Sequence, residues 1–269
     1  MPHKYFSIEG FPTYINYRGA TTLPGVAPDL SRGASILCLH GSGGNGNVFA
    51  ELMDRLAETH SPCAFDQPGH GRTGGLDSLG SIERMTDFTR SVLEKLGVVR
   101  PVLLGHSMGG AVALDYALRY PQELRAIILC SSAARFEITD ELLDFEQRVT
   151  EGKERRAFRR EIFSSSTAPD VMRRAFMEDM KTDPRARYGD LLACREWNAE
   201  ARLEALALPC LVMVGEDELP SLAQQAELLA SRIPGARKQV VSKAAHALPL
   251  EAPDALAEAL LGFLSELET

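Results

Sequence analysis

The chain has 269 residues, of which 45% are hydrophobic and 25% are charged, as in an ordinary folded protein rather than a disordered or fibrous one. A chain of this length buries enough apolar surface to fold without disulfides, so we expect one domain. The formal net charge of -8 offers no positive field to phosphate backbones or anionic lipids, which argues against nucleic acid and membranes as partners.

The N-terminal segment predicts the edge of a sheet and no targeting sequence. Lys4 and Glu9 interrupt the start of the chain, which contains no long apolar run, so we expect no secretory signal, no membrane span and a cytoplasmic location. Residues 5–9 and 13–18 are β-rich and predict an antiparallel pair of strands. A loop that contains Pro and Gly follows at residues 20–33.

Apolar runs later in the chain predict buried strands. These runs are residues 35–39, 101–104, 126–130 and 210–214, with a shorter strand that ends at Asp66 and a last strand at residues 238–242. Helical patterns lie between and after them, at residues 85–96, 108–120, 222–232 and 253–267. The alternation predicts an α/β fold in which helices cover both faces of a mostly parallel sheet.

Residues 134–198 break this alternation, because they are helix-prone, rich in charge and contain no convincing strand. We predict that they form an inserted helical cap, and that residues 1–133 and 199–269 form the core domain. The insertion has thirteen basic and fourteen acidic residues. Its basic run at residues 153–160 is therefore expected to be a solvated helix face rather than an anion-binding site.

The cysteines are odd in number, form no CxxC pair and mostly lie in apolar strand-like runs. We expect them to be reduced, buried and apolar in character. They are Cys38, Cys63, Cys130, Cys194 and Cys210. The sequence contains no HExxH motif or close His/Asp cluster, so no metal site is expected.

A glycine-flanked serine stands where a strand should meet a helix, in Gly105-His-Ser-Met-Gly109. At such a sharp turn the serine backbone is strained, and side chains two residues before and after it would collide, which explains the glycines. The turn lifts the hydroxyl of Ser107 clear of the sheet. It also presents the Met108 N–H to negative charge that develops on a substrate. The pattern predicts that Ser107 is a catalytic nucleophile.

A serine nucleophile needs a histidine that takes its proton and later returns it to the leaving group. Of the six histidines, His246 follows the expected last strand and lies after the nucleophile in the chain. His106 is next to Ser107, but its side chain should point away from the hydroxyl, which leaves it a surface or packing role. Surface, packing or loop-shaping roles are expected for the other four, which are His3, His40, His60 and His70.

Several segments together resemble the α/β-hydrolase family over essentially the whole chain: His40-Gly-Ser-Gly-Gly44, Asp66-Gln-Pro-Gly-His-Gly-Arg72, Gly105-His-Ser-Met-Gly-Gly110 and the late His246. The resemblance implies the α/β-hydrolase fold with an eight-stranded sheet. It places the family's catalytic histidine at His246. It also places the second oxyanion-hole donor at Ser42, beside Met108 as the first, with Gly41 letting the backbone approach the substrate. No cofactor would be required.

Two residues of Gly215-Glu-Asp-Glu-Leu-Pro220 are candidates for the acid that orients His246. Members of the family usually carry aspartate three residues after this glycine. Here the third position is Glu218, whereas Asp217 stands one residue early. We prefer Glu218 by position, because a glutamate can serve if the backbone lies slightly farther back, and Asp217 remains the alternative.

The motifs predict a serine hydrolase that cleaves an ester, lactone or thioester of a small molecule through an acyl-enzyme. The dehalogenase and epoxide-hydrolase branches of the family have aspartate at the position of the nucleophile, whereas this chain has serine. Hydrolysis of a C–C bond next to a ketone is the alternative, although such enzymes usually have Asn and Trp where this chain has His106 and Ala247. We expect the substrate pocket to lie between the cap and the sheet. Trp197 is a candidate for lining this pocket, but a buried position at the hinge of the cap suits this residue better. The oligomeric state stays open.

Two further functions have some support from the sequence. Residues 41–46 satisfy GxGxxG and Asp66 follows, as in dinucleotide-binding oxidoreductases. Against this reading, two strands precede the motif and Ser107 and His246 would be unexplained. A catalytically silent receptor that has kept the fold is the other possibility, and the intact serine and histidine argue against it.

Overall fold

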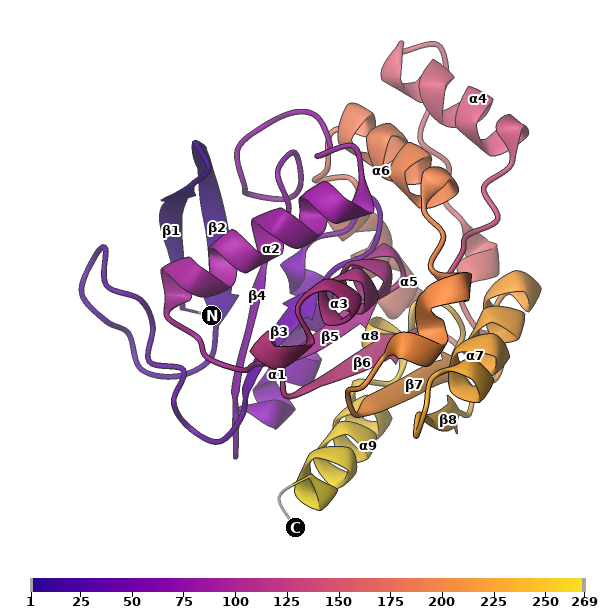
Figure 1. Cartoon of the computed structure of the whole chain (residues 1–269). Coiled ribbons are helices and arrows are strands. Elements are labelled where there is room, and N and C mark those ends of the chain that lie inside the picture. Colours follow the sequence, from indigo (N-terminus) through magenta and orange to yellow (C-terminus); the bar gives the residue numbers. More distant parts are fainter. Residues whose placement is uncertain (1, 268–269) are drawn as a thin grey trace.

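The computed structural model describes residues 2–267; residues 1, 268 and 269, at the ends of the predicted core domain, lie outside the described residues. The strands form one eight-stranded sheet in the order β1-β2-β4-β3-β5-β6-β7-β8 (Figure 1). Their bounds are β1 (His3–Ile8), β2 (Phe11–Tyr17), β3 (Ser35–Leu39), β4 (Ser61–Phe65), β5 (Val102–His106), β6 (Ala126–Cys130), β7 (Cys210–Gly215) and β8 (Arg237–Val241). All of the predicted strands are present, with ends shifted by a few residues at most.

The pairing of the strands confirms the predicted fold class. β1 pairs antiparallel with β2, and β2 pairs antiparallel with β4. All the remaining pairs are parallel. Every residue of β4, β6 and β7 is buried, as expected for strands that are covered on both faces. Because parallel strands place their carboxyl ends at one edge, the loops after β3, β5, β7 and β8 come together there.

Helices cover both faces of the sheet (Figure 1). Side chains of α2 (Ile82–Leu96), α3 (Met108–Arg119) and α7 (Pro220–Arg232) belong to the apolar core on one face. Side chains of α1 (Ala50–Leu56) and α9 (Pro253–Glu266) belong to the core on the other. α2 begins earlier than predicted because the Ser81 hydroxyl caps it by accepting a hydrogen bond from the Arg84 N–H. The short helix α1 was not predicted.

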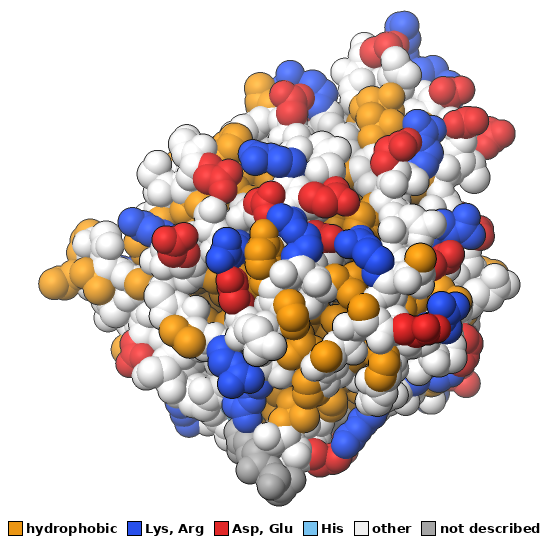
Figure 2. All heavy atoms as spheres, viewed as in Figure 1, with side chains coloured by type: hydrophobic (Ala, Val, Ile, Leu, Met, Phe, Trp, Pro, Cys, Tyr) orange, Lys and Arg blue, Asp and Glu red, His pale blue; other side chains and the backbone are white. Residues whose placement is uncertain are grey.

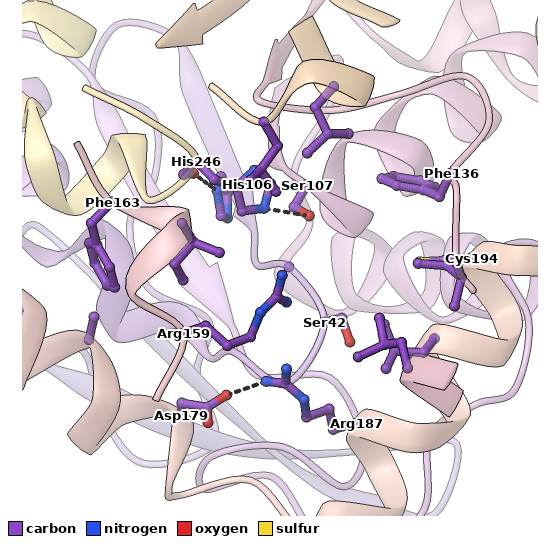
Figure 3. Close-up of a pocket in the computed structure, with 18 of the residues that line it drawn as sticks. Ser42, His106, Ser107, Phe136, Arg159, Phe163, Asp179, Arg187, Cys194 and His246 are labelled. Carbon is purple, nitrogen blue, oxygen red and sulfur yellow. Dashed lines mark hydrogen bonds and ion pairs between the residues drawn. The ribbon is translucent and has the colours of Figure 1, made fainter. Parts of the chain in front are cut away.

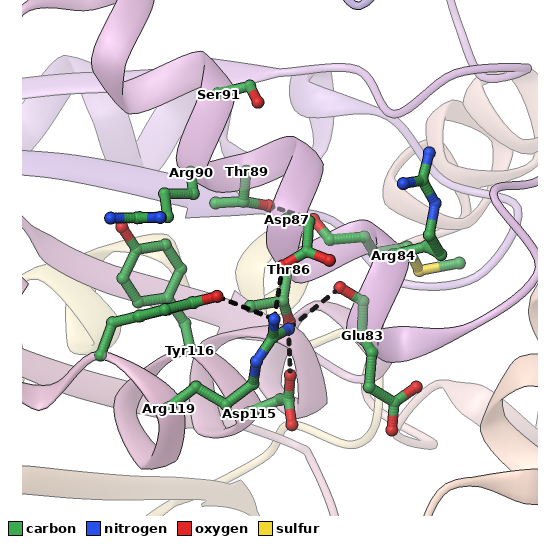
Figure 4. A network of polar contacts seen from close by, with 12 residues as sticks. Glu83, Arg84, Thr86, Asp87, Thr89, Arg90, Ser91, Asp115, Tyr116 and Arg119 are labelled. Atoms are coloured by element: carbon green, nitrogen blue, oxygen red, sulfur yellow. Dashed lines mark hydrogen bonds and ion pairs between the residues drawn. The ribbon is translucent and has the colours of Figure 1, made fainter.

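A network of polar contacts joins α2 to α3 and thereby fixes the helix that follows Ser107 (Figure 4). Arg119 of α3 donates hydrogen bonds to Asp87 (2.6 Å), to the buried carboxylate of Asp115 (3.3 Å) and to the carbonyl of Glu83 (3.2 Å). Two of these partners lie on α2 and one lies on α3. The guanidinium therefore holds the two helices together at their solvent-facing side.

The segment between β6 and β7 is built of helices, namely α4 (Asp140–Thr150), α5 (Pro169–Asp179) and α6 (Pro184–Glu196), and Figure 1 shows them over one end of the sheet. A single antiparallel bridge between Arg135 and Asn198 closes the base of this segment. The Ala199 N–H also donates to the Ala134 carbonyl, at 2.9 Å. We call residues 134–198 the insertion. Its status as a separate cap domain stays a prediction.

The helix expected at residues 153–160 is wrong, although most of these residues are exposed, as a solvated segment should be. The segment is irregular up to the short 3-10 helix η3 (Arg160–Ile162), because α4 ends at Thr150 and Gly152 turns the chain with a left-handed φ of 71°. The Arg156 side chain is only 6% exposed and donates to the carbonyls of Asp179 and Thr182 at the end of α5. Carbonyls at a helix C-terminus lack partners within the helix, so an arginine is drawn inward to satisfy them.

The cysteines are free and buried, as predicted. Burial raises the pKa of the Cys63 thiol to about 12 and that of Cys210 to about 12, so both stay protonated at neutral pH. In the part of the chain that the structure describes, no helix is long and apolar enough to cross a membrane. Basic and acidic side chains are interspersed on the face shown in Figure 2.

Replacement of Ile128 in β6 by alanine should lower the free energy of unfolding by about 2 to 5 kcal/mol, because the side chain is 0% exposed and its loss leaves a cavity. Val99→Ala is the matched control: Val99 is 83% exposed, and its truncation should change stability by less than about 0.5 kcal/mol. Urea unfolding followed by circular dichroism measures both variants. Equal losses of stability would contradict this description of the core.

Candidate active site

Ser107 lies at a strained turn between β5 and α3. Its backbone has φ 53° and ψ -123°, a conformation that L-residues rarely adopt. A Cβ on Gly105 would lie 2.2 Å from the Gly109 carbonyl oxygen, and one on Gly109 would lie 2.1 Å from that of Leu39. Glycine is therefore required two residues before and two residues after the serine, as the motif predicts.

His246 lies within hydrogen-bonding distance of this serine, although 139 residues separate the two in the chain. Its Nε2 is 3.1 Å from the Ser107 Oγ. The histidine belongs to the loop between β8 and the short helix α8 (Leu248–Glu251), and the serine follows β5. Both loops leave the carboxyl ends of parallel strands, which brings the imidazole and the hydroxyl to the same edge of the sheet.

The other ring nitrogen of His246 faces Glu218 rather than Asp217. Its Nδ1 is 3.2 Å from Glu218 Oε1, and the glutamate side chain is fully buried. Burial alone would raise the pKa of this carboxyl, but its interaction with His246 and the Leu219 N–H outweighs burial and lowers the pKa. Asp217 has another partner, because it accepts a hydrogen bond of 2.5 Å from the Ser164 hydroxyl. Of the two predicted acids, only Glu218 makes a hydrogen bond to the imidazole.

His106 has a closer relation to the site than sequence reasoning indicated, because besides packing next to His246 it makes a hydrogen bond to the backbone of that residue. Its Nε2 is 2.7 Å from the carbonyl oxygen of His246, and the two rings lie 5.0 Å apart. Burial, with a contribution from His246, lowers the pKa of His106 to about 4, so the ring is neutral at pH 7. A neutral imidazole whose Nε2 faces a carbonyl must carry its proton there. His106 thus donates to the backbone of His246, which holds the loop in place.

The loop after β3 brings two further predicted residues beside the serine. A Cβ on Gly41 would lie 3.0 Å from the Ser107 Cβ, so glycine allows this close approach. Ser42 and Gly41 both line the cavity next to Ser107. Met108 is the first residue of α3, where the N–H has no acceptor inside the helix. Within residues 2–267, neither the Ser42 N–H nor the Met108 N–H donates a hydrogen bond to the protein.

A buried carboxylate of the insertion ties this loop in place. Asp190 of α6 accepts hydrogen bonds from the Gly43 N–H (3.1 Å), from the Ser78 hydroxyl (2.7 Å) and from His70 Nε2 (2.8 Å). Burial opposes the charged form of His70, but Asp190 outweighs it and raises the pKa of this imidazole. Burial would raise the pKa of Asp190, but His70, Ser78 and Gly43 lower it. The two side chains form a buried, hydrogen-bonded pair that sequence reasoning did not find, and it is an ion pair when His70 is protonated.

The other loop residues have the shaping roles that were expected. His40 Nε2 accepts a hydrogen bond of 3.0 Å from the Gln67 N–H, and burial lowers the pKa of His40 to about 3. Asp66 accepts from the N–H groups of Gly46 (2.7 Å) and Arg72 (2.8 Å). Because both carboxylate oxygens are occupied in this way, Asp66 is not presented to a ribose, and the dinucleotide-binding interpretation loses its acidic residue.

A cavity of about 240 Å³ opens over Ser107 between the insertion and the sheet. Figure 3 shows Ser107 and His246 on one side of it, Phe136 and Phe163 at its flanks, and Arg159 and Arg187 reaching in from the insertion. Further apolar side chains of its wall come from the insertion and from α7, namely Ile138, Leu142, Phe158, Ile162, Leu191 and Leu222. The pocket therefore lies where it was expected.

Trp197 is not among the residues that line this cavity, so its position does not support the suggestion that it binds substrate. The side chain is 3% exposed and belongs to the core on the α2 and α3 face. It lies directly after α6, where the chain returns to the sheet, and a large apolar ring is more stable buried there.

A second, smaller cavity of about 100 Å³ adjoins the first. It shares His246, Ser42 and Gly41 with the larger cavity, but Ser107 does not line it. Its wall beyond His246 is mostly apolar, with Val48, Ala247, Pro249 and Leu250. Within residues 2–267, no group of three or more His, Cys, Asp or Glu side chains lies close enough together to hold a metal ion.

Comparison with known proteins identifies the family of the chain. The sequence pattern of the "Alpha/beta hydrolase family" matches residues 36–259. The chain is 26% identical to a putative carbamate hydrolase, RutD, of Azorhizobium caulinodans over 88% of this chain and 93% of that protein. It is 28% identical to a pimeloyl-[acyl-carrier protein] methyl ester esterase of Neisseria meningitidis, over 82% of this chain and 74% of that protein. The fold matches an esterase from Thermogutta terrifontis with a TM-score of 0.84 at 23% identity, and the match covers all of both chains.

The buried pair of His70 and Asp190 should make stability depend on pH. A raised His70 pKa stabilises the fold fully below the unfolded value of about 6.5, and this contribution is lost as pH rises through the folded pKa. The lowered pKa of Asp190 stabilises the fold above the unfolded value of about 3.9, and this stabilisation is lost as pH falls through the folded pKa of Asp190. His70→Gln should therefore cost more stability at pH 5.5 than at pH 8.5.

Urea unfolding of the wild type and His70→Gln at both pH values measures this difference. His3→Gln serves as the control, because His3 is exposed on the edge strand β1 and makes no ion pair or hydrogen bond with Asp190. A loss of stability in His70→Gln that is the same at both pH values would show that the pair carries no charge.

Proposed function

Because the chain belongs to the α/β-hydrolase family and is an enzyme of the ester-hydrolase type, we propose that it cleaves its substrate through an acyl-enzyme on Ser107. The observation that carries the proposal is the continuous line of contacts from Ser107 through His246 to Glu218. Its two distances are 3.1 Å from hydroxyl to imidazole and 3.2 Å from imidazole to carboxylate. Nucleophile, base and orienting acid are thus all within reach of one another.

In the first half of the proposed reaction, Ser107 Oγ attacks the carbonyl carbon of the substrate while His246 Nε2 takes the hydroxyl proton. Negative charge moves to the carbonyl oxygen. When the tetrahedral intermediate collapses, the bond to the leaving group breaks and His246 returns its proton to that group. The acyl group remains esterified to Ser107.

In the second half, His246 takes a proton from water as the water oxygen attacks the acyl carbon. The bond from the acyl carbon to Ser107 Oγ then breaks, and the proton on His246 returns to the serine. The products are a carboxylic acid and the free enzyme. Glu218 stays ionised throughout; its lowered pKa suits it to hold the Nδ1–H tautomer and to stabilise the imidazolium.

We propose the N–H groups of Ser42 and Met108 as the two donors to the oxyanion. Both are without a protein acceptor within the described residues; Ser42 lies in the loop after β3, and Met108 is the first residue of α3, directly after Ser107. The Gly43 N–H on the same loop is held by Asp190, which keeps the Ser42 peptide from turning away. Donors that are fixed before the reaction need no reorganisation when the charge develops.

The two cavities suit the two parts of an ester. The larger cavity contains Ser107 and has an apolar wall, so it is proposed to hold the acyl group. The smaller cavity is lined by His246 but not by Ser107, so it is proposed to hold the leaving group, which receives its proton from that imidazole. Carboxylic esters, lactones and thioesters of small molecules are the substrates that this arrangement fits.

Glu218→Gln should lower kcat by about 10³- to 10⁴-fold, because an amide cannot stabilise the imidazolium and favours the wrong tautomer of His246. Asp217→Asn is the matched control. Its carboxylate contacts Ser164 and not the histidine, so this change should lower kcat by less than about 10-fold. Steady-state kinetics with a p-nitrophenyl ester measure both. Small, equal losses in the two variants would exclude both residues as the orienting acid.

A panel of p-nitrophenyl esters of increasing acyl length tests the proposed activity as a whole. The wild type should hydrolyse part of the panel, and Ser107→Ala should be slower by about 10⁴-fold or more, since the variant lacks the attacking oxygen. Circular dichroism should show that Ser107→Ala is folded. Ester hydrolysis that survives in the folded Ser107→Ala protein would overturn the assignment of the nucleophile.

A further inference from the structure

Most of the charge in the wall of the larger cavity is neutralised within the protein. Arg187 donates to Glu146 at 2.9 Å and to Asp179 at 2.8 Å, and its side chain is 9% exposed. Asp179 has a second cation nearby, since a carboxylate oxygen lies 3.5 Å from Arg156. These groups form a closed set of ion pairs that leaves no charge for a ligand.

Arg159 differs from these residues. Its Nε donates to Glu161 at 2.9 Å, and its two terminal nitrogens have no partner among residues 2–267. Figure 3 shows the side chain reaching from the insertion into the cavity, with its guanidinium toward the side on which Ser107 and His246 lie. The side chain of Glu161 is 57% exposed, and this residue does not line the cavity. The end of the guanidinium is therefore presented to whatever fills the pocket.

The surroundings of Arg159 favour an anion. Ile162 and Phe163 follow Arg159 in the chain and line the same cavity, and apolar neighbours strengthen a charge-assisted hydrogen bond by excluding water. The remaining carboxylate of the wall, Glu137, is exposed, so solvent screens its repulsion. A planar guanidinium with two free terminal nitrogens matches the geometry of a carboxylate.

The position of Arg159 also indicates which part of the substrate carries the anion. Arg159 lines the larger cavity together with Ser107 and does not line the smaller one. Under the proposed function, the larger cavity holds the acyl group and the smaller one holds the leaving group. An anion that meets Arg159 must then belong to the acyl group.

We propose that Arg159 binds a carboxylate on the acyl group, so that the preferred substrates are monoesters or monothioesters of dicarboxylic acids. This inference rests on the proposed function and names its substrate class. Arg159 acts here as a specificity-determining residue and takes no part in bond breaking.

The test compares mono-4-nitrophenyl esters of adipic, pimelic and suberic acids with the 4-nitrophenyl esters of hexanoic, heptanoic and octanoic acids. Each pair has the same number of acyl carbons and differs in the terminal carboxylate. The wild type should prefer the anionic ester at one length or more, by about 10-fold or more in kcat/KM. Arg159→Gln should lower kcat/KM for the preferred anionic ester by about 10- to 100-fold, the value of a lost charge-assisted hydrogen bond. Its effect on the neutral ester should stay below about 3-fold.

Arg155→Gln is the matched control, because Arg155 carries the same charge four residues away, is exposed and does not line the cavity. It should leave both series unchanged. Arg159→Lys should retain part of the preference. No preference at any length in the wild type would overturn the proposal, and so would equal losses of both series in Arg159→Gln or equal effects of Arg159→Gln and Arg155→Gln.

A binding measurement separates this proposal from the proposed function. Isothermal titration calorimetry of Ser107→Ala with the monomethyl ester of pimelic acid should show binding that is weakened about 10-fold or more by the added Arg159→Gln change. Methyl heptanoate should bind both proteins alike. If neither ester series is hydrolysed by the wild type, the proposed function fails. If binding to Ser107→Ala does not depend on Arg159, the anion site fails.

Discussion

The contact between the Ser107 hydroxyl and the His246 imidazole is the constraint around which the rest of the molecule is arranged. It requires a serine backbone at φ 53°, which is tolerable only because Gly105 and Gly109 remove the side chains that would collide. It also requires that two loops far apart in the sequence leave the same edge of the sheet. The parallel order of β5, β6, β7 and β8 supplies that edge, and the full burial of β6 and β7 keeps its centre rigid.

The insertion contributes more than a cover for the pocket. Through Asp190 it holds the Gly43 N–H and His70, so that the loop carrying Ser42 is braced from outside the sheet. Through Arg156 and Arg187 it neutralises its own buried carboxylates, which keeps the cavity wall ordered without an unpaired charge. One side chain, Arg159, is left out of this balance and faces the cavity. The insertion therefore both completes the pocket and supplies Arg159, the residue proposed to determine substrate selectivity.

Local patterns in the sequence were sufficient to predict the sheet and the strained turn at Ser107. Apolar runs marked the strands, and the fixed relation between glycine and a strained serine marked the turn at Ser107, because both are properties of a few neighbouring residues. Spacing after Gly215 also favoured Glu218, which is the acid that makes a hydrogen bond to His246. The short helix α1 escaped notice, since seven residues show little periodicity.

Contacts that join distant parts of the chain could not be predicted in this way. The pairing of Asp190 with His70 spans 120 residues, and that of His106 with the His246 carbonyl spans 140. The basic run of the insertion was taken for a solvated face because its composition is balanced by acids, but composition does not say which arginine turns inward. Arg156 turns inward because it donates to backbone carbonyls at and just after the end of α5, and this contact exists only in the folded chain.

Covalent labelling with a fluorophosphonate, followed by peptide mass spectrometry, tests the central claim most directly. The reagent reacts with a serine only when a neighbouring base activates it, so the account predicts one adduct, located on Ser107, and much slower labelling in His246→Gln. An unmodified protein that still hydrolyses esters, or an adduct on another residue, would contradict the claim that this hydroxyl and this imidazole act as one unit.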